Sequence, residues 1–169
     1  VRSGIAYISK DRDRESLALD ASIAENIASA GLDVNRIAGL LYSPRKERAY
    51  VRAQSDRLKI KCTSADQAVR ALSGGNKQKV VFGKWFAKEC EIYIMDCPTR
   101  GIDIGIKQEI YRLIYEMKKQ GKSIVIISEE MPELIGMSDR LLVMKNGRIN
   151  GEFFRANGMR EQDILDCMI

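Results

Sequence analysis

Histidine is absent from this sequence of 169 residues. Because histidine is the commonest general base and metal ligand, its absence excludes Ser-His-Asp and Cys-His hydrolases. The sequence has only 3 prolines, and its 13 glycines follow no repeat, which excludes collagen-like and disordered architectures. It has no apolar run of about 18 residues, so no membrane-spanning helix is expected. No basic and apolar leader precedes the first strand, so no secretory signal is expected either.

Cysteine is scarce, and no two of the 4 cysteines form a CxxC pair. Most of them lie within apolar or helical stretches. We therefore expect free thiols in a reducing compartment rather than a disulfide framework or a zinc site. The cysteines are Cys62, Cys90, Cys97 and Cys167.

The rest of the composition is typical of a globular protein, with 45% hydrophobic and 30% charged residues. The length is enough for one domain with a real core. The net charge of +5 allows an acidic partner without requiring one. The sequence begins at Val1 rather than at a methionine, and residues 4–8 already have the pattern of a strand. We therefore expect a piece of a longer chain.

The first 71 residues divide into two parts. Residues 1–19 predict a short strand followed by a charged loop at 9–15. Residues 20–71 predict a small helical subdomain. One helix is expected at 21–30 and another at 44–58, where a proline suits the first turn. No strand is expected within this subdomain.

From residue 72 onward, short apolar stretches alternate with amphipathic helices. We expect helices near 76–88 and 106–120, strands ending near residues 95, 127 and 144, and a hairpin turn at 145–148. This alternation predicts an α/β fold, with a parallel sheet covered by helices on both faces. Such sheets bind ligands beyond the carboxyl ends of their strands, which is where Asp96 and Ser128-Glu129 stand.

The stretch 72–78 reads Leu-Ser-Gly-Gly-Asn-Lys-Gln and precedes a helix. Glycines let the backbone approach a ligand closely, and the free N–H groups of a helix N-terminus favour an anion. A serine at this place is also an ordinary helix cap. These residues alone leave both interpretations open.

Asp96 directly follows the apolar strand 92–95. A carboxylate there can hold Mg²⁺ against a nucleotide, directly or through water, or merely cap the strand end. The two motifs, in this order, resemble the nucleotide-binding domain of ABC transporters. Residues 72–78 are similar to its signature, Asp96 to the end of its Walker B strand, and 100–103 to its D-loop.

Residues 98–105 and 128–140 resemble the bacterial monosaccharide importers of the ribose, galactose and xylose type. Residues 8–12 resemble the segment that replaces the Q-loop in the second half of their tandem ATPase. The resemblance covers essentially the whole sequence. It implies a P-loop NTPase-like cassette without its Walker A portion, in which 72–169 is part of the RecA-like core. It further implies the C-terminal part of the second cassette.

The resemblance also implies the site residues. ATP and Mg²⁺ would be the cofactors, and Asp96 would hold Mg²⁺ through water. The residues implied to bind nucleotide are Ser73, Gly74, Gly75, Asn76, Gln78, Lys10 and Asp103.

The sequence also departs from the family pattern. It has no GxxxxGK[ST] motif, so the loop that cradles the phosphates, with its lysine, lies outside it. Cys97 stands where the family has its catalytic glutamate, and Glu129 stands where most cassettes have the switch histidine. A thiol is a poor base, and the simplest interpretation of Cys97 is a small packed side chain. We expect this site to bind ATP with little or no turnover, while the intact signature completes the site of the partner cassette.

The implied partners are the first cassette of the same chain, membrane permease subunits and, indirectly, a periplasmic sugar-binding protein. The implied location is the cytoplasmic face of the bacterial inner membrane, where ATP hydrolysis would drive monosaccharide uptake. The fragment alone is expected to be inactive.

Two other functions are conceivable. A non-transport ABC ATPase would share the signature, but not the importer-like stretches 98–105 and 128–140. A basic helical stretch could bind nucleic acid, but Glu47 and Asp56 interrupt it and stacking aromatics are few. A solvated helix face is the simpler interpretation, so no nucleic acid is expected. The basic residues of this stretch are Arg45, Lys46, Arg48, Arg52, Arg57, Lys59 and Lys61.

Overall fold

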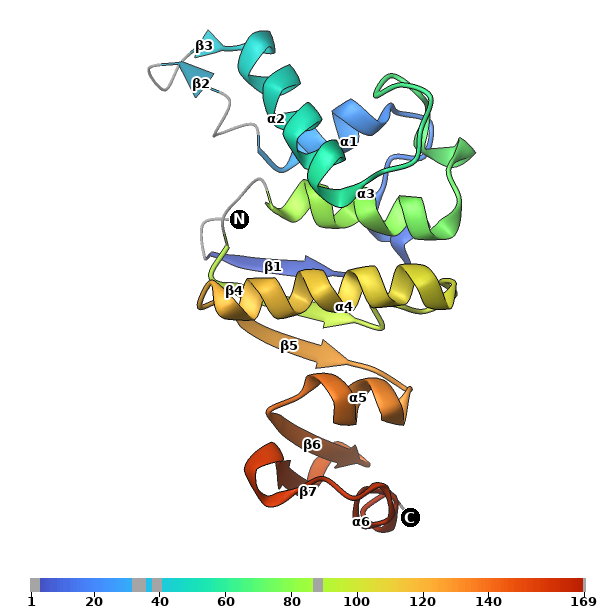
Figure 1. Ribbon diagram of the computed structural model, residues 1–169, viewed down its shortest axis with the longest axis vertical. Helices are drawn as coiled ribbons and strands as arrows, with labels where there is room; N and C mark the ends of the chain where they lie inside the picture. The colour runs from blue at the N-terminus through green and yellow to red at the C-terminus, as the bar shows by residue number, and fades with distance from the viewer. Residues whose placement is uncertain (1–3, 32–35, 38–40, 87–89, 169) are drawn as a thin grey trace. The chain divides into compact units, whose positions relative to one another are not determined.

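The computed structural model describes residues 4–31, 36–37, 41–86 and 90–168, with the backbone alone for 36–37 and 41–42. The chain forms two compact units, Val1–Val125 and Ile126–Ile169, each of which is treated by itself (Figure 1). The division of the chain at residues 19 and 71 stays a prediction.

The first unit contains a three-stranded sheet with the strand order β1-β4-β5. The strands are β1 (Ile5–Ile8), β4 (Ile92–Asp96) and β5 (Ser123–Ile127), close to the expected ranges. β1 and β4 are parallel, which confirms the expected α/β sheet. Alternate residues of these two strands are almost completely buried, because they face a core on one side of the sheet. They are Ala6, Ile8, Tyr93 and Met95.

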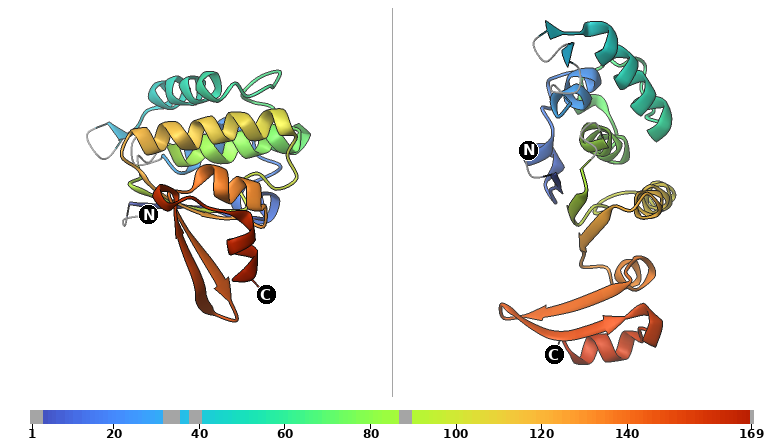
Figure 2. Two further views of the ribbon diagram at one scale, coloured as in Figure 1. Left: turned by 60° about the horizontal axis from the view of Figure 1, so that its bottom comes forward. Right: turned by 90° about the vertical axis from the view of Figure 1, so that its left-hand side faces the viewer.

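Two helices of the first unit lie on the same side of this sheet. These are α3 (Gly74–Phe86) and α4 (Ile104–Lys119), which lie together to one side of β1 and β4 in the right-hand view of Figure 2. On the opposite face, Tyr7 and Ile92 are 47% and 37% exposed. The expectation of helices on both faces is therefore wrong for the described residues of this unit, because their helices cover one face only.

The region between the first two sheet strands is mainly helical, as expected. α1 (Ile23–Ser29) begins after Ser22, which sets its start slightly later than expected. The Ser22 hydroxyl accepts a hydrogen bond from the Glu25 N–H at 3.1 Å, and the Glu25 carboxylate accepts one from the Ser22 N–H at 2.7 Å. This reciprocal cap satisfies two N–H groups that the helix itself cannot.

α2 (Pro44–Leu58) has the expected range, and Lys59 ends it in the left-handed conformation with φ of 50°. Between α1 and α2, the short strand β2 (Arg36–Ile37) pairs antiparallel with β3 (Leu41–Tyr42). The expectation of no strand in this region is therefore wrong. Two-residue strands are too short to produce a recognisable alternation in the sequence.

α3 begins at Gly74 rather than near residue 76. Ser73 caps this helix, since its Oγ accepts a hydrogen bond from the Asn76 N–H at 3.4 Å and its carbonyl accepts one from the Lys77 N–H at 2.9 Å. Both glycines of the motif thus lie in the first turn, where backbone N–H groups have no partner within the helix. The last two residues expected for this helix, 87 and 88, lie outside the described residues.

An ion pair between a buried lysine and a partly exposed glutamate joins α3 to α4. The Lys79 side chain is 3% exposed, and its Nζ lies 2.6 Å from a carboxylate oxygen of Glu109. Nζ also donates a hydrogen bond to the Lys59 carbonyl at 3.2 Å. The hydrogen bond from Lys79 holds the pKa of Glu109 below its usual value of 4.5.

Glu109→Gln should lower the free energy of unfolding of the chain by about 2 kcal/mol. The effect should fall below the ~3–5 kcal/mol of fully buried pairs because the Glu109 side chain is 44% exposed. A carboxylate whose pKa is lowered in the folded state stabilises the fold at pH values above its pKa in the unfolded state. This stabilisation is lost as the pH falls through its pKa in the folded state. The difference between the two proteins in urea unfolding should therefore be full at pH 7 and shrink below pH 4.5. Glu116→Gln, at an exposed position of the same helix, should change stability much less. Equal losses for the two variants would contradict this prediction.

The second unit contains a β-hairpin and two helices around a core of its own. β6 (Arg140–Lys145) pairs antiparallel with β7 (Arg148–Phe154). The turn between them has positive φ angles at Asn146 and Gly147, which confirms the expected hairpin turn. α5 (Met131–Met137) and α6 (Glu161–Asp166) complete the unit. Its buried core residues are Leu141, Val143 and Ile164.

Candidate nucleotide site

The parallel strands β1 and β4 end at the same edge of the sheet. Ile8 is paired with Met95, so the chain leaves the sheet at this edge twice, once at Ser9-Lys10 and once at Asp96-Cys97. The structure thus places Lys10 and Asp96, which are distant in sequence, at the same edge of the sheet. Both are half-buried. This edge is where ligands of parallel sheets bind.

Cys97 has a left-handed backbone conformation, with φ of 46°. A residue other than glycine rarely adopts this conformation, which often marks a functional turn. The Arg100 N–H donates a hydrogen bond to the Cys97 carbonyl at 3.1 Å, so the chain reverses in a tight turn directly after the strand. The Cys97 side chain is only half-buried, so it can be reached from the sheet edge.

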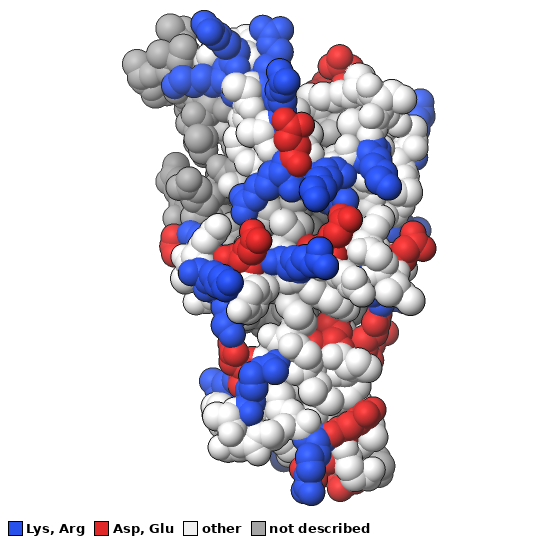
Figure 3. Space-filling view, in the orientation of Figure 1, with Lys and Arg blue, Asp and Glu red and all other residues white. Residues whose placement is uncertain are grey.

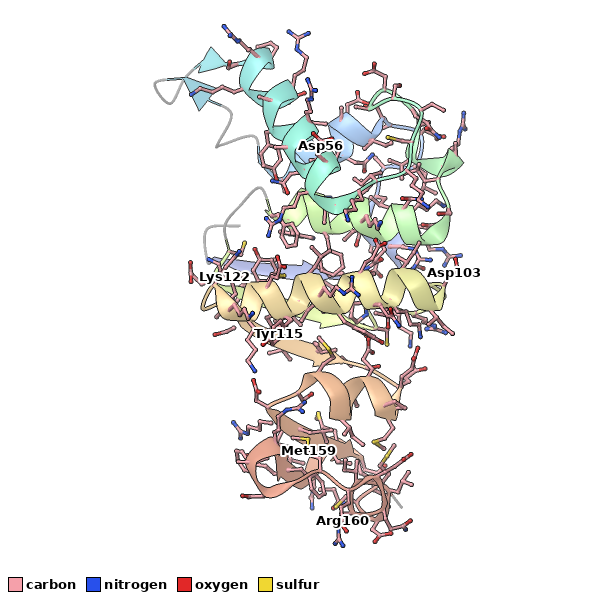
Figure 4. All side chains as sticks on the ribbon, in the orientation of Figure 1. Asp56, Asp103, Tyr115, Lys122, Met159 and Arg160 are labelled. Carbon is pink, nitrogen blue, oxygen red and sulfur yellow. The ribbon has the colours of Figure 1, made fainter. Side chains whose placement is uncertain are left out.

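The loop that follows Cys97 is fixed by its buried residues and presents a charged one. Thr99 is 1% exposed and Ile102 is 9% exposed. Asp103 is exposed at the start of α4, and its side chain makes no hydrogen bond to the first turn of that helix (Figure 4). The loop 97–103 therefore holds its backbone in place and leaves the Asp103 carboxylate at the surface.

The start of α3 has an exposed serine held by a buried amide. The Ser73 Oγ accepts a hydrogen bond from the Asn76 Nδ2 at 3.0 Å, and the Asn76 Oδ1 accepts one from the Lys61 N–H at 2.9 Å. Ser73 is therefore a helix cap, as its simpler interpretation required. The cap leaves the Ser73 side chain at the surface, so a second role in binding a ligand stays a prediction.

Each glycine of the motif has a close neighbour. A methyl group at Gly75 would come within 2.4 Å of the Ile106 Cδ1 in α4, so only glycine lets the two helices approach this closely. A methyl group at Gly74 would come within 2.9 Å of the Arg12 Nη2. Packing against Ile106 therefore explains Gly75, whereas Gly74 lies next to the guanidinium group of Arg12.

Two other residues implied to bind nucleotide are directed inward. Asn76 is 7% exposed and Gln78 is 2% exposed. The Asn76 amide is already used between Ser73 and Lys61. Their direct contact with a nucleotide stays a prediction, and burial favours a role in holding the helix start in place.

Arg12 is the residue of this region that the sequence did not single out. It begins a short π-helix, η1 (Arg12–Ser16), in the charged loop after β1. Its Nη1 donates a hydrogen bond to the Arg100 carbonyl at 3.0 Å, across 88 positions of sequence. No local spacing signals such a contact, and the resemblance of residues 8–12 to the segment that replaces the Q-loop named Lys10 and not Arg12 for a role.

Glu129 lies in the second unit, two residues after the end of β5, and is exposed. Its expected place after a strand is confirmed. Its role at the position of a switch histidine stays a prediction.

A metal ion at the sheet edge would depend on few protein ligands. Within the described parts of the chain, no group of three or more His, Cys, Asp or Glu residues could hold a metal by itself. Mg²⁺ commonly binds one carboxylate, phosphate oxygens and water molecules. The single half-buried carboxylate of Asp96 fits that mode and does not fit a closed protein-only site.

The basic stretch lies on the exposed side of α2, where Figure 3 shows Lys and Arg side chains gathered at the top of the view. Arg52 lies 4.0 Å from Asp56, and Arg57 lies 4.7 Å from the centre of the Phe86 ring. The one aromatic residue of α2, Tyr50, donates its hydroxyl to the Gly83 carbonyl at 2.9 Å. These contacts support a solvated helix face and provide no exposed ring on which a base could stack.

No helix in the described part of the chain has the length and apolar character needed to cross a membrane. No family model matches the chain. It is 44% identical over 165 residues to the ribose import ATP-binding protein RbsA of Geobacillus kaustophilus, covering 98% of this chain and 33% of that protein. It is 42% identical over 157 residues to the arabinose import ATP-binding protein AraG 2 of Burkholderia cenocepacia, covering 93% of this chain and 30% of that protein. The chain is homologous to one part of the sugar-import ATP-binding proteins. It spans about a third of the length of these curated relatives.

Solved structures show the fold. The ATP-binding cassette MJ0796, a dimer bound to ADP and phosphate, gives a TM-score of 0.75 at 19% identity, over 90% of this chain and 63% of that one. The cbiO1 protein of Clostridium perfringens, part of the ABC transporter complex cbiONQ, gives a TM-score of 0.74 at 25% identity. This match covers 98% of this chain and 62% of that one. The fold of this sugar-import ATP-binding homologue is therefore that of a partial ABC ATPase cassette, which confirms the expected fold class.

Proposed function

We propose that the chain is the C-terminal part of the second cassette of a tandem ATPase that powers monosaccharide import. The observation that carries the proposal is the placement of two motifs within one ABC fold. The Ser73 motif starts a helix with free N–H groups, and Asp96 ends a strand at the ligand-binding edge of the sheet. The importer names of the relatives support sugar transport over a non-transport ABC ATPase.

The two motifs would serve different nucleotides. In the ABC arrangement, two cassettes enclose each ATP between the Walker motifs of one and the signature of the other. Residues 73–75 of this chain would therefore complete the site of the first cassette, and Asp96 and Cys97 would belong to the site of this one. The exposed Ser73 and the half-exposed Gly74 support such a contact.

The start of α3 would stabilise phosphate charge in the first site. The partial positive charge of a helix N-terminus and its unpaired N–H groups favour an anion. The buried hydrogen bond between Asn76 and Lys61 would hold this helix start in place, so that little reorganisation is needed when ATP arrives.

The second site would bind ATP but hydrolyse it poorly. Bound Mg²⁺ would neutralise phosphate charge, and Asp96 would orient it through water. Cys97 offers no carboxylate to orient an attacking water. Two unequal sites follow, with turnover mainly in the one that the signature of this chain completes.

The exposed face of the sheet supports a larger assembly. Tyr7 and Ile92 leave apolar surface open on that face. The upstream part of the cassette, with its phosphate-binding loop, would cover this face. Permease subunits would hold the complete protein at the cytoplasmic face of the membrane, and a periplasmic sugar-binding protein would deliver the sugar.

The proposal is tested by ATP hydrolysis and sugar uptake in vesicles that contain the complete ATPase with its permease. Hydrolysis should be coupled to uptake of a monosaccharide. An active ATPase that assembles with no permease would instead support a non-transport ABC protein.

The chain by itself should bind Mg-ATP weakly, with a dissociation constant on the order of 1 mM or above. The reason is that its sequence lacks the phosphate-cradling motif, and it retains only one half of each proposed site. Calorimetry with the purified chain provides the measurement, and the complete protein serves as the control. Micromolar affinity, or turnover clearly above that of a blank, would contradict the prediction.

A further inference from the structure

The Arg12 side chain lies between the two loops that the proposed function places beside nucleotides. Its Nη1 donates to the Arg100 carbonyl at 3.0 Å. Its Nη2 lies so close to Gly74 that a methyl group there would come within 2.9 Å of it, and a methyl group at Gly101 would lie 4.0 Å from it. One guanidinium group thus contacts the start of α3 and the loop 97–103.

The segment that carries Arg12 is fixed to α3 at two further points. Asp13 forms an ion pair with Lys77 at 2.8 Å, and the Lys84 Nζ donates to the Ser16 carbonyl at 2.9 Å. Burial lowers the pKa of Lys84. η1 therefore lies along α3, and Arg12 extends from it toward the loop after β4.

The Arg12 side chain is only 19% exposed. Its Nε is buried and has no hydrogen-bond acceptor among the described residues, and Asp13 Oδ1 lies 4.0 Å from it. A guanidinium group has a rigid, planar set of donors, so it can fix the distance between two backbone segments as a lysine ammonium cannot. A partly buried charge without full pairing is weak evidence for stabilisation, so the placement that this contact provides is the better explanation for it.

We propose that Arg12 is a positioning residue that sets the spacing between the signature start at Gly74 and the loop 97–103. The inference rests on the proposed function, since these are the segments that would contact the two nucleotides. Arg12 would thereby link the signature, which serves the first site, to the turn at Cys97, which belongs to the second. Displacement of η1 would move both segments together.

The test uses hydrogen–deuterium exchange and steady-state kinetics of the complete ATPase. Arg12→Ala should raise the exchange rate of the Arg100 amide, which donates to the Cys97 carbonyl, by about tenfold. It should also lower kcat by about tenfold while KM for ATP changes by less than about twofold, because positioning acts on the reacting geometry.

Arg12→Lys keeps the charge but loses the planar set of donors, and it should restore only part of kcat. Arg14→Ala is the matched control, since Arg14 lies in the same segment with its side chain 87% exposed. It should change neither quantity.

A second arm uses Gly74→Ala, which should displace Arg12 and so raise exchange at Arg100, 26 positions away in sequence. In the Arg12→Ala background the same substitution should add nothing at Arg100. Additive effects, or an Arg100 exchange rate that Arg12→Ala leaves unchanged, would overturn the proposal. Exchange does not depend on activity. A protein without any ATPase activity would contradict the proposed function and would still report on Arg12.

Discussion

Ser73→Arg should abolish ATP hydrolysis by the complete ATPase, a loss of more than about 100-fold in kcat. The exposed Ser73 stands at the N-terminus of α3, where the proposed function places the phosphates held by the first cassette. In the proposed function, an arginine there would occupy the place of these phosphates. It would also remove the Oγ that accepts hydrogen bonds from Asn76 at 3.4 and 3.0 Å. ATPase measurement on the assembled transporter, with assembly checked by size-exclusion chromatography, provides the test.

Ser73→Ala separates the cap from the site. It leaves the space open and removes the cap, at a cost of about 1 kcal/mol in stability. If Ser73 acts on nucleotide, the alanine variant should lose activity while it remains folded, and the arginine variant should lose nearly all of it. If the arginine variant assembled normally and kept most of its activity, Ser73 would be a helix cap only.

The sequence predicted the parts of this fold that depend on local chemistry. α2 was predicted at its observed range because Ser43 and Pro44 form a strong start signal. The strands β1, β4 and β5 were predicted because each is a short, continuous apolar run, a pattern typical of strands in a parallel sheet. The prediction errors occurred where the sequence signal of an element was short or could mark more than one kind of structure. β2 and β3 have only two residues each. α3 starts at Gly74, directly after its cap, although glycine has a low helix propensity.

The site could be predicted only where a residue follows its own strand or starts its own helix. Asp96 and Ser73 are of that kind, and the structure places them at a strand end and a helix start. Arg12 is not, because its partner Arg100 is 88 positions away and no periodicity links the two. The inward direction of Gln78 was also hidden, because burial of a polar side chain depends on neighbours that only the folded chain brings near. The open face of the sheet could not be predicted either, since an apolar strand looks the same whichever segment covers it.

Cys97→Glu should add ATP hydrolysis at the second site, by about tenfold over its starting rate. A carboxylate at the end of β4 can orient and activate the attacking water, whereas the thiol cannot. The backbone at Cys97 has φ of 46°, and glutamate, like cysteine, is not branched at Cβ, so the exchange adds no new clash of that kind. We expect partial rescue only. If Glu129 stands at the place of the usual histidine, as the proposed function assumes, it would add a second negative charge near the γ-phosphate, and like charges disfavour one another.

The measurement is a single-turnover assay of the complete ATPase in which the first cassette's own catalytic glutamate has been removed, so that only the second site reports. Cys97→Gln is the matched control, because glutamine has the size of glutamate without its charge. Its hydrolysis rate should equal that of the protein with Cys97. Combining Cys97→Glu with Glu129→His should raise the rate further if both positions silence the site. If Cys97→Glu leaves the rate unchanged, a residue other than Cys97 causes the low activity of the second site, and Glu129 is the next residue to test. A fast rate with cysteine in place would contradict the model of two unequal sites, because the second site would then hydrolyse ATP without a carboxylate at position 97.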